Sequence, residues 1–173
     1  GGNLGRPQDI PFVIECLRAA VHVPDAFFVI CGSGTEYGKL RTFVEAEKYS
    51  NLLLLSGLPR ADYDKLVRSC HVGLLFLDHR FTIPNFPSRL LSYLQAGLPV
   101  IACTDPATDI GDIAQAGGFG WKCPSDDPAA FVRTVERACS ADLAAMGDAG
   151  RMYFSAHYTA EQSYEIIMRG LER

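Results

Sequence analysis

Five short apolar runs recur along the chain, and a segment with helical periodicity follows each of them. The runs cover residues 26–31, 52–55, 72–77, 100–103 and 119–123. An apolar run, a glycine or proline turn and then a helix form the repeating unit of a parallel sheet. Because such crossovers are right-handed, the alternation predicts an α/β fold, with a doubly wound, Rossmann-like parallel sheet flanked by helices.

The helices between and after these runs carry recognisable start signals. We expect helices at about 9–21, 35–49, 62–70, 110–116 and 127–139. Pro11 and Pro128 fall in first turns, where the N–H group that proline lacks would have no partner within the helix. Ser140 is predicted to cap a helix that reaches about residue 156. The segment 159–162, Thr-Ala-Glu-Gln, matches a capping box that opens a terminal helix.

The stretch 81–105 contains a polar loop, a helix and a buried strand in succession. Leu90, Leu91, Leu94 and Leu98 recur at helical spacing, and Pro87 suits the first turn. The first amide groups of this helix, with Ser88 and Arg89 beside them, are typical of an anion site. An ordinary helix cap with a solvated arginine is the alternative interpretation.

Glycines cluster at the chain start and after two of the strands. Three of the first five residues are glycine, which allows close approach to a ligand; a flexible terminus is the alternative. We interpret Gly1 as the end of a first strand. The Gly32-Ser33-Gly34 turn lacks the third glycine of a dinucleotide fingerprint, because Tyr37 occupies that position.

Composition limits the function classes. The 173 residues are 48% hydrophobic and carry a formal net charge of -4, which predicts one compact domain and argues against nonspecific nucleic-acid binding. The six cysteines include no Cys-x-x-Cys pair and are interpreted as buried free thiols in a reducing compartment. Neither a membrane span nor a signal peptide is apparent in the sequence, so we expect a cytoplasmic location.

Five segments together resemble the C-terminal, donor-binding half of GT-B-fold retaining glycosyltransferases of family 4, the group 1 type. They are Gly-Asn-Leu-Gly at 2–5, Cys-Gly-Ser-Gly-Thr at 31–35, Leu-Ser-Gly-Leu-Pro-Arg at 55–60, Phe-Pro-Ser-Arg-Leu-Leu-Ser-Tyr-Leu-Gln-Ala-Gly-Leu-Pro-Val-Ile-Ala at 86–102, and Ser-Asp-Asp-Pro-Ala-Ala-Phe at 125–131. The resemblance covers essentially the whole chain. It implies that residues 1–173 bind the nucleotide-sugar donor, while an N-terminal domain outside this chain binds the acceptor.

The resemblance also implies a role for each segment. The first loop would contact the diphosphate or the sugar, the second would form the floor beside the nucleotide, the third would border the base, and the helix start would hold the diphosphate. In this order the implied residues are Gly2, Asn3, Gly5 and Arg6; Gly32 and Gly34; Gly57, Leu58 and Pro59; and Pro87, Ser88, Arg89, Leu90 and Ser92.

The chain departs from the family pattern at its charged positions. Members typically carry a Glu-x7-Glu motif, and the corresponding residues here are Pro84 and Ser92. Ser92 can still hydrogen-bond a ribose hydroxyl, without the strength of a carboxylate. The basic pair of the first loop falls at Asn3 and Gln8, so Arg6 and Arg89 are the catalytic candidates that would balance the diphosphate charge.

Other polar residues have two readings. Asp78, Asp105 and Asp109 could contact sugar hydroxyls, but we interpret them as solvated loop residues. His79 and Arg80 follow the fourth apolar run and face the expected cleft, or are surface residues. His22, His71 and His157 have no metal-ligand spacing, and Trp121 and Tyr93 are predicted to pack in or beside the core.

The resemblance implies hexosyl transfer with retention from a UDP- or GDP-linked sugar to a saccharide or lipid-linked acceptor, in cell-surface polysaccharide synthesis. No cofactor or metal is expected to be required, and the partners are the nucleotide-sugar and the N-terminal domain. We expect no nucleic-acid partner, an inactive isolated domain, and a full-length protein peripheral to the inner face of the membrane. The alternatives are a noncatalytic nucleotide-binding or interaction module and a nucleotide-sugar epimerase domain.

Overall fold

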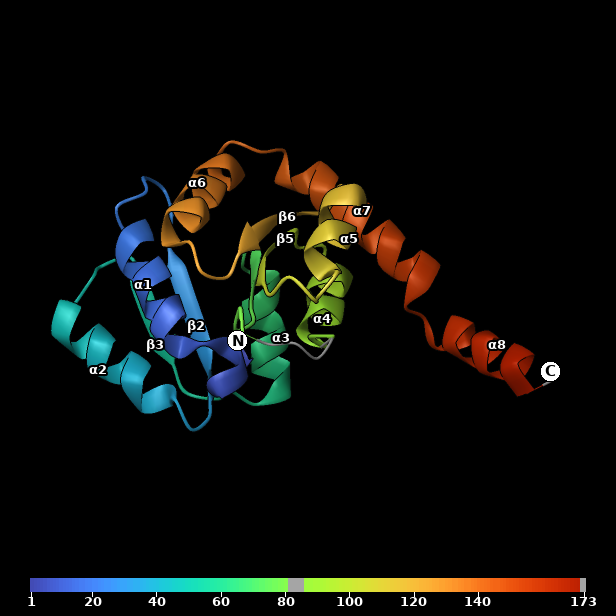
Figure 1. The fold of residues 1–173 in the computed structure, drawn as a ribbon, viewed down its shortest axis with the longest axis horizontal. Helices are drawn as coiled ribbons and strands as arrows, with labels where there is room; N and C mark the ends of the chain where they lie inside the picture. Colours follow the sequence, from blue (N-terminus) through green and yellow to red (C-terminus); the bar gives the residue numbers. More distant parts are fainter. Residues whose placement is uncertain (81–85, 172–173) are drawn as a thin grey trace.

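A computed structural model describes residues 1–80 and 86–171 (Figure 1). Strands and helices alternate along the chain, as the apolar runs predict. In chain order the elements are β1 (Gly2–Asn3), the 3-10 turn η1 (Arg6–Gln8), α1 (Ile10–Ala20), β2 (Phe28–Ser33), α2 (Tyr37–Glu47), β3 (Leu52–Leu55), α3 (Arg60–Arg68), β4 (Gly73–Phe76), α4 (Arg89–Ala96), β5 (Val100–Thr104), α5 (Ile110–Ala116), β6 (Gly120–Pro124), α6 (Pro128–Cys139), α7 (Leu143–His157) and α8 (Ala160–Leu171).

Every described strand pair is parallel, but the strands form two sheets of three, with the orders β1-β2-β3 and β4-β5-β6. The predicted α/β fold with parallel strands flanked by helices is confirmed. β1 pairs with Gly32 and Ser33 at the end of β2. An apolar cavity of about 520 Å³ lies between the two sheets and is lined by residues of both, including Phe28, Val29 and Leu74.

Helices cover both faces, as in a doubly wound fold. Alternate residues of β5 and β6 point to opposite faces, because side chains on a strand have a period of two. Ile101 and Trp121 join the core beneath α1 and α6, whereas Val100 and Ala102 join the core beneath α4 and α5. Phe131 of α6 is fully buried and packs against Phe76 of β4 at 5.5 Å between ring centroids.

Most predicted helix boundaries are confirmed within two residues, and the errors have local causes. Ser140 does not cap α7; it ends α6, and the Asp142 carboxylate accepts the amide N–H of Ala145 at 3.0 Å instead. A carboxylate satisfies a first-turn donor as well as a hydroxyl does. Pro87 precedes the N-cap of α4, Ser88, rather than lying in the helix.

The acidic loop residues are less exposed than expected. Asp78 and Asp105 are buried, so their interpretation as solvated residues is wrong, whereas Asp109 is exposed. Asp105 is fully buried because it accepts hydrogen bonds from the amide N–H of Ala107 at 2.9 Å and the hydroxyl of Thr108 at 2.8 Å. These bonds satisfy the carboxylate locally, at a turn that ends β5.

The free cysteines and the two aromatic residues follow the sequence interpretation with two exceptions. All six cysteines are free thiols, but Cys70 is only half-buried and Cys139 is exposed at the end of α6, so these two do not share the predicted burial. Trp121 and Tyr93 are buried core residues. Among the described residues, no helix combines the length and hydropathy that crossing a membrane requires. The α8 helix projects away from the body of the fold (Figure 1).

Candidate functional site

Two glycine-rich loops lie against each other at the carboxyl ends of β1 and β2. Gly2 lies opposite Gly32 in the parallel register, and Asn3 lies opposite Ser33. A Cβ atom on Gly32 would overlap the carbonyl oxygen of Gly2, so only glycine permits this approach. The amide N–H of Leu4 continues the pairing by donating to the Ser33 carbonyl at 2.9 Å. The loops therefore form one surface where open α/β sheets bind ligands.

The side chain of Gln8 holds the first loop closed. Its Oε1 atom accepts the amide N–H of Gly5 at 3.0 Å. The second loop adds a bond from the amide of Glu36 to the carbonyl of Leu4 at 3.0 Å, beside Gly34. Gln8 occupies a position where the resembling family often has a basic residue, and here its role in the loop is structural.

Arg89 is the cation of this region. It is the first residue of α4 and is half-buried, with its guanidinium against the backbone of Gly2. Its Cζ atom lies 4.8 Å from the ring centroid of Tyr63 on α3. None of the ion pairs found among residues 1–80 and 86–171 includes Arg89. The positive charge is therefore not neutralised by a described acidic side chain.

A cavity of about 290 Å³ brings the first loop and the start of α4 together. Its polar lining consists of Asn3, Gln8, Ser88 and Arg89. The rest is largely apolar and comes from the first loop, α1, α2, β2, β4 and the residues around β4 and before α4. Ser88 is exposed, and its hydroxyl makes no capping hydrogen bond. The first amide N–H groups of a helix also lack partners within the helix. A hydroxyl, a guanidinium and a positive helix end thus share one small space, which suits a phosphate group.

The third predicted segment lies beside the second loop. An ideal Cβ on Gly57 would lie 3.7 Å from the Ser33 hydroxyl oxygen, so the two loops are neighbours. Leu58 is exposed, and Pro59 is the N-cap residue of α3. The structure therefore places this segment next to the second glycine loop, and its contact with a base stays a prediction.

Three predicted site residues, Arg6, Ser92 and Leu90, line neither cavity. Arg6 is exposed in η1 and lines neither cavity, so it stands apart from Arg89. Ser92 is half-buried on α4 and also lines neither. The Leu90 side chain is fully buried in the core. Pro84 lies outside the described residues.

Sequence reasoning did not find Tyr63. It stands on α3, one helical turn after Pro59, and its amide N–H donates to the Pro59 carbonyl at 2.9 Å. The sequence signal that could have identified Tyr63 is its position, one turn into the helix that follows the Gly-Leu-Pro segment. Its approach to Arg89 depends on how α3 and α4 pack, which no local pattern reports.

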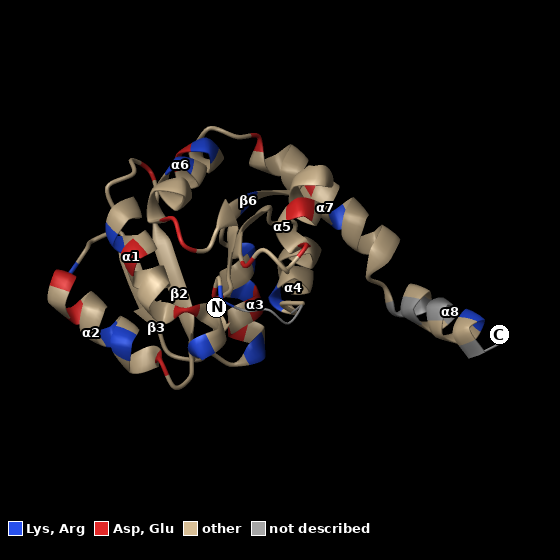
Figure 2. Ribbon diagram, in the orientation of Figure 1, with Lys and Arg blue, Asp and Glu red and all other residues tan. Residues whose placement is uncertain are grey.

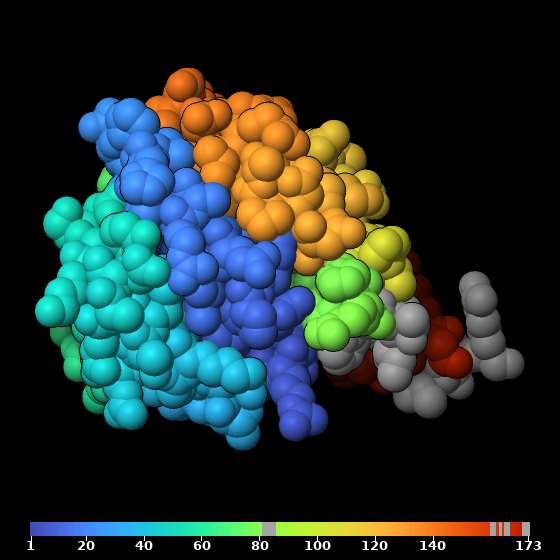
Figure 3. All heavy atoms as spheres, turned by 60° about the vertical axis from the view of Figure 1, so that its left-hand side comes forward, coloured from blue at the N-terminus to red at the C-terminus, as the bar shows by residue number. Residues whose placement is uncertain are grey.

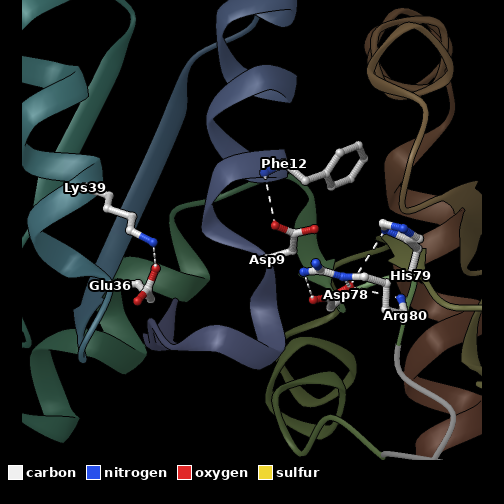
Figure 4. Close-up of polar contacts among 7 residues, drawn as sticks. All are labelled: Asp9, Phe12, Glu36, Lys39, Asp78, His79 and Arg80. Carbon is white, nitrogen blue, oxygen red and sulfur yellow. Dashed lines mark hydrogen bonds and ion pairs between the residues drawn. The ribbon is translucent and has the colours of Figure 1, made fainter.

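A second polar cluster anchors the loop after β4 to the first loop (Figure 4). The guanidinium of Arg80 donates to both carboxylate oxygens of Asp78, at 2.8 and 2.6 Å, and the amide N–H of Asp78 donates to the Pro7 carbonyl at 3.0 Å. Asp9 and His79 lie beside this pair. In Figure 3 the residues that follow β4, in bright green, border the blue N-terminal segment.

The Arg80 side chain determines what this cluster can do. Asp9, Asp78 and His79 each offer a ligand atom within 4.8 Å of the others, the spacing of a metal site. However, hydrogen bonds from Arg80 lower the pKa of Asp78 to about 2 and already occupy both of its oxygens. The cluster therefore holds the loop after β4 against the first loop.

Replacing Asp78 with asparagine should change how stability depends on pH. The folded pKa of about 2 lies below the ordinary value of 3.8, so the carboxylate contributes stability that is complete above about pH 4 and is lost as pH falls toward 2. Denaturant unfolding should show a loss of about 1 to 2 kcal/mol for Asp78→Asn at neutral pH, and a flatter profile between pH 4 and 2. Asp148→Asn, which removes an exposed ion pair with Arg151, is the control and should keep the wild-type slope.

Charge elsewhere is dispersed. Lys and Arg residues alternate with Asp and Glu over the helices, and α3 carries both kinds (Figure 2). No ion pair involving Arg89 or Arg68 is found among the described residues, but only Arg89 lines the cavity. The positive character of the site is therefore local, as expected for recognition of a small anion rather than a polyanion.

This fold defines one class of protein: an α/β half-domain of the GT-B type, with helices on both faces and glycine loops near a helix start. The model of the family described as "Glycosyl transferases group 1" matches residues 2–141. The chain belongs to the group 1 glycosyltransferases.

Relatives agree with this assignment. The chain is 26% identical over 164 residues to the probable glycosyltransferase WbjE of Pseudomonas aeruginosa; the match covers 95% of this chain and 41% of that protein. The chain thus spans less than half the length of this curated relative.

Solved structures share the fold. Anabaena Alr3699/HepE, in complex with UDP, superposes with a TM-score of 0.76 at 17% identity, over 99% of this chain and 48% of that one. The pneumococcal O-GlcNAc transferase GtfA, in complex with UDP and GlcNAc, superposes with a TM-score of 0.72 at 18% identity, over 99% of this chain and 35% of that one. The catalytic domain of the Helicobacter pylori cholesterol-α-glucosyltransferase superposes with a TM-score of 0.70 at 11% identity, over 91% of this chain and 95% of that one.

Proposed function

We propose that this domain binds the nucleoside diphosphate of a sugar donor, with the diphosphate at the start of α4. The observation that carries the proposal is Arg89, a half-buried guanidinium that lines the 290 Å³ cavity and has no acidic partner in the part of the chain that the structure describes. A cation held in this way gains most from an anionic ligand with several acceptor oxygens. Family membership and the UDP complexes of HepE and GtfA support the same ligand class.

In the proposed reaction, Arg89 stabilises the departing diphosphate. Negative charge develops on the leaving group as the glycosidic carbon becomes oxocarbenium-like, and a preorganised cation lowers the free energy of that state. Ser88 and the first amide groups of α4 donate hydrogen bonds to the phosphate oxygens. The close approach of Gly2 to Gly32 lets the sugar and the phosphates lie against bare backbone.

The remaining predicted residues receive subsidiary roles. Gly57, Leu58 and Pro59 border the base, beside Ser33. Ser92 is proposed to hydrogen-bond the ribose if the ligand extends along α4, a neutral contact where the family typically has a carboxylate. Arg6 is proposed to face the cleft from η1, outside the cavity. These assignments make Arg89 the principal determinant of diphosphate affinity.

The whole-protein activity follows as a proposal from the family. The full enzyme transfers a hexosyl group with retention to a saccharide or lipid-linked acceptor held by an N-terminal domain, in cell-surface polysaccharide synthesis. Structural neighbours of the chain include WaaG, a glycosyltransferase involved in lipopolysaccharide biosynthesis. The isolated domain would be inactive because the acceptor half of the cleft lies on another domain. We place this reaction on the cytoplasmic side of the membrane.

Calorimetric titration tests the donor-site proposal. UDP, GDP, ADP and NAD are titrated into the folded domain, first without metal and then with Mg²⁺. We expect saturable binding of UDP or GDP, with similar affinity with and without metal, and none of NAD, because the third glycine of the dinucleotide fingerprint is absent. A folded protein that binds none of the four would contradict the proposal.

One observation favours a second function. Ser92 stands where the family typically has a ribose-binding carboxylate, and it lines neither cavity. A noncatalytic nucleotide-binding module would lose this carboxylate without penalty. Sugar transfer or donor hydrolysis by the full-length protein would rule that module out, whereas nucleotide binding with neither activity would favour it.

A further inference from the structure

The orientation of Arg89 depends on a residue that contributes no charge. Several other arginines with described partners are fixed by carboxylates: Arg80 by Asp78, and Arg151 by Asp148. Arg89 is instead stacked on the ring of Tyr63, with its Cζ atom 4.8 Å from the ring centroid. A carboxylate would hold the guanidinium but neutralise it, whereas an aromatic face holds it and leaves its outer N–H groups free to donate.

The guanidinium is confined on a second side by the first glycine loop. A Cβ atom on Gly2 would overlap its Nη2 atom, and Gly2 has a φ of +101°, a backbone conformation that glycine adopts readily. Tyr63 and Gly2 thus both contact one planar cation. Arg89 loses little further rotamer freedom when it binds an anion, because these contacts have already ordered it.

The surroundings of Tyr63 hold its ring in place. Its amide N–H donates to the Pro59 carbonyl, and its side chain packs against the core beneath α3 and α4. Burial, more than the neighbouring Tyr63, raises the pKa of Tyr93 well above its ordinary value, so Tyr93 adds no negative charge near Arg89.

We infer that Tyr63 is a positioning residue for diphosphate binding: its ring orients Arg89 toward the cavity without neutralising it. This inference rests on the proposed function. It also links two parts of the site, because Tyr63 belongs to α3, the helix that begins after the Gly57-Leu58-Pro59 segment. A movement of that segment would shift Tyr63 and so change the orientation of Arg89 toward the diphosphate.

A double-mutant cycle measured with UDP and with uridine tests the inference. Tyr63→Leu should weaken UDP binding about 3- to 10-fold and leave uridine binding unchanged, because uridine has no phosphate for Arg89. Tyr63→Phe keeps the ring and should bind UDP within about twofold of wild type. In an Arg89→Ala background, Tyr63→Leu should have no further effect on UDP. Tyr49→Leu, far from the cavity, controls for the loss of a half-buried tyrosine ring.

The outcomes separate the two proposals. If the folded wild type binds no nucleoside diphosphate, the proposed function fails, and the inference fails with it. If the wild type binds UDP but Tyr63→Leu and Arg89→Ala act additively, or Tyr63→Leu weakens uridine equally, Tyr63 does not act through Arg89 and only the inference fails. Thermal midpoints of all variants identify any loss that is due to unfolding.

Discussion

Arg89→Ala is expected to weaken UDP binding about 10- to 100-fold while leaving the fold intact. The change removes charge-assisted hydrogen bonds to the diphosphate, which contribute about 1.5 to 3 kcal/mol. Arg89 is half-buried and has no carboxylate partner among the described residues, so no buried acid is left unpaired. The measurement is a calorimetric titration of both proteins at one salt concentration, repeated at higher salt, where the difference should shrink.

Arg68→Ala is the matched control. Arg68 is an exposed arginine in the last turn of α3 that lines neither cavity, so its removal changes the net charge equally. UDP affinity should stay within about twofold of wild type. Equal affinities of the Arg89→Ala protein and the parent would remove the diphosphate assignment. Equal losses in both variants would mean that net charge, rather than the geometry at α4, determines binding.

Gly32→Ala is expected to damage both stability and binding. The new methyl group would overlap the Gly2 carbonyl oxygen, which belongs to the backbone and can move only if the first loop moves. Overpacking of this kind costs about 1 to 3 kcal/mol, measured by denaturant unfolding. Displacement of the loop also shifts Gly2 away from Arg89, so UDP affinity should fall roughly 10- to 100-fold.

Gly38→Ala makes the same chemical change without the collision. Gly38 lies in α2, and a Cβ there would meet nothing within 4 Å. Because alanine favours a helix interior over glycine, stability should rise by about 0.5 to 1 kcal/mol, the opposite sign from Gly32→Ala. A Gly32→Ala protein with wild-type stability and UDP affinity would show that the two loops do not meet as the structure describes.

Local sequence patterns predicted the segments that form the candidate site. The glycine loops and the start of α4 were predicted, because close backbone approach and a helix start each leave a signal within a few residues. The structure places Gly2 against Gly32 and beside Arg89, and Ser88 and Arg89 line the same cavity. That these residues hold an anion stays a prediction, and Pro87 lies before the helix rather than in it.

Contacts between residues far apart in the chain were not predicted. Arg6 was grouped with Arg89 because both are basic and near glycine loops; in the structure Arg6 is exposed and lines neither cavity, and its role stays a prediction. Asp78 was interpreted as solvated because it follows a strand, but the bonds from Arg80 and to the Pro7 carbonyl hold it between two loops, where it is buried. A side chain's partners depend on packing between elements that a local pattern does not describe.

The sequence by itself determined the order and type of the elements, since apolar periodicity and turn residues act over a few positions. It also carried the family resemblance, because the glycine and helix-start motifs keep their order along the chain. Only the tertiary structure decided that β1 pairs with the end of β2, and that the ring of Tyr63 rather than an acidic side chain lies against Arg89. These two facts depend on contacts between residues far apart in the chain, and the free energy of such contacts is set by the packing of whole elements.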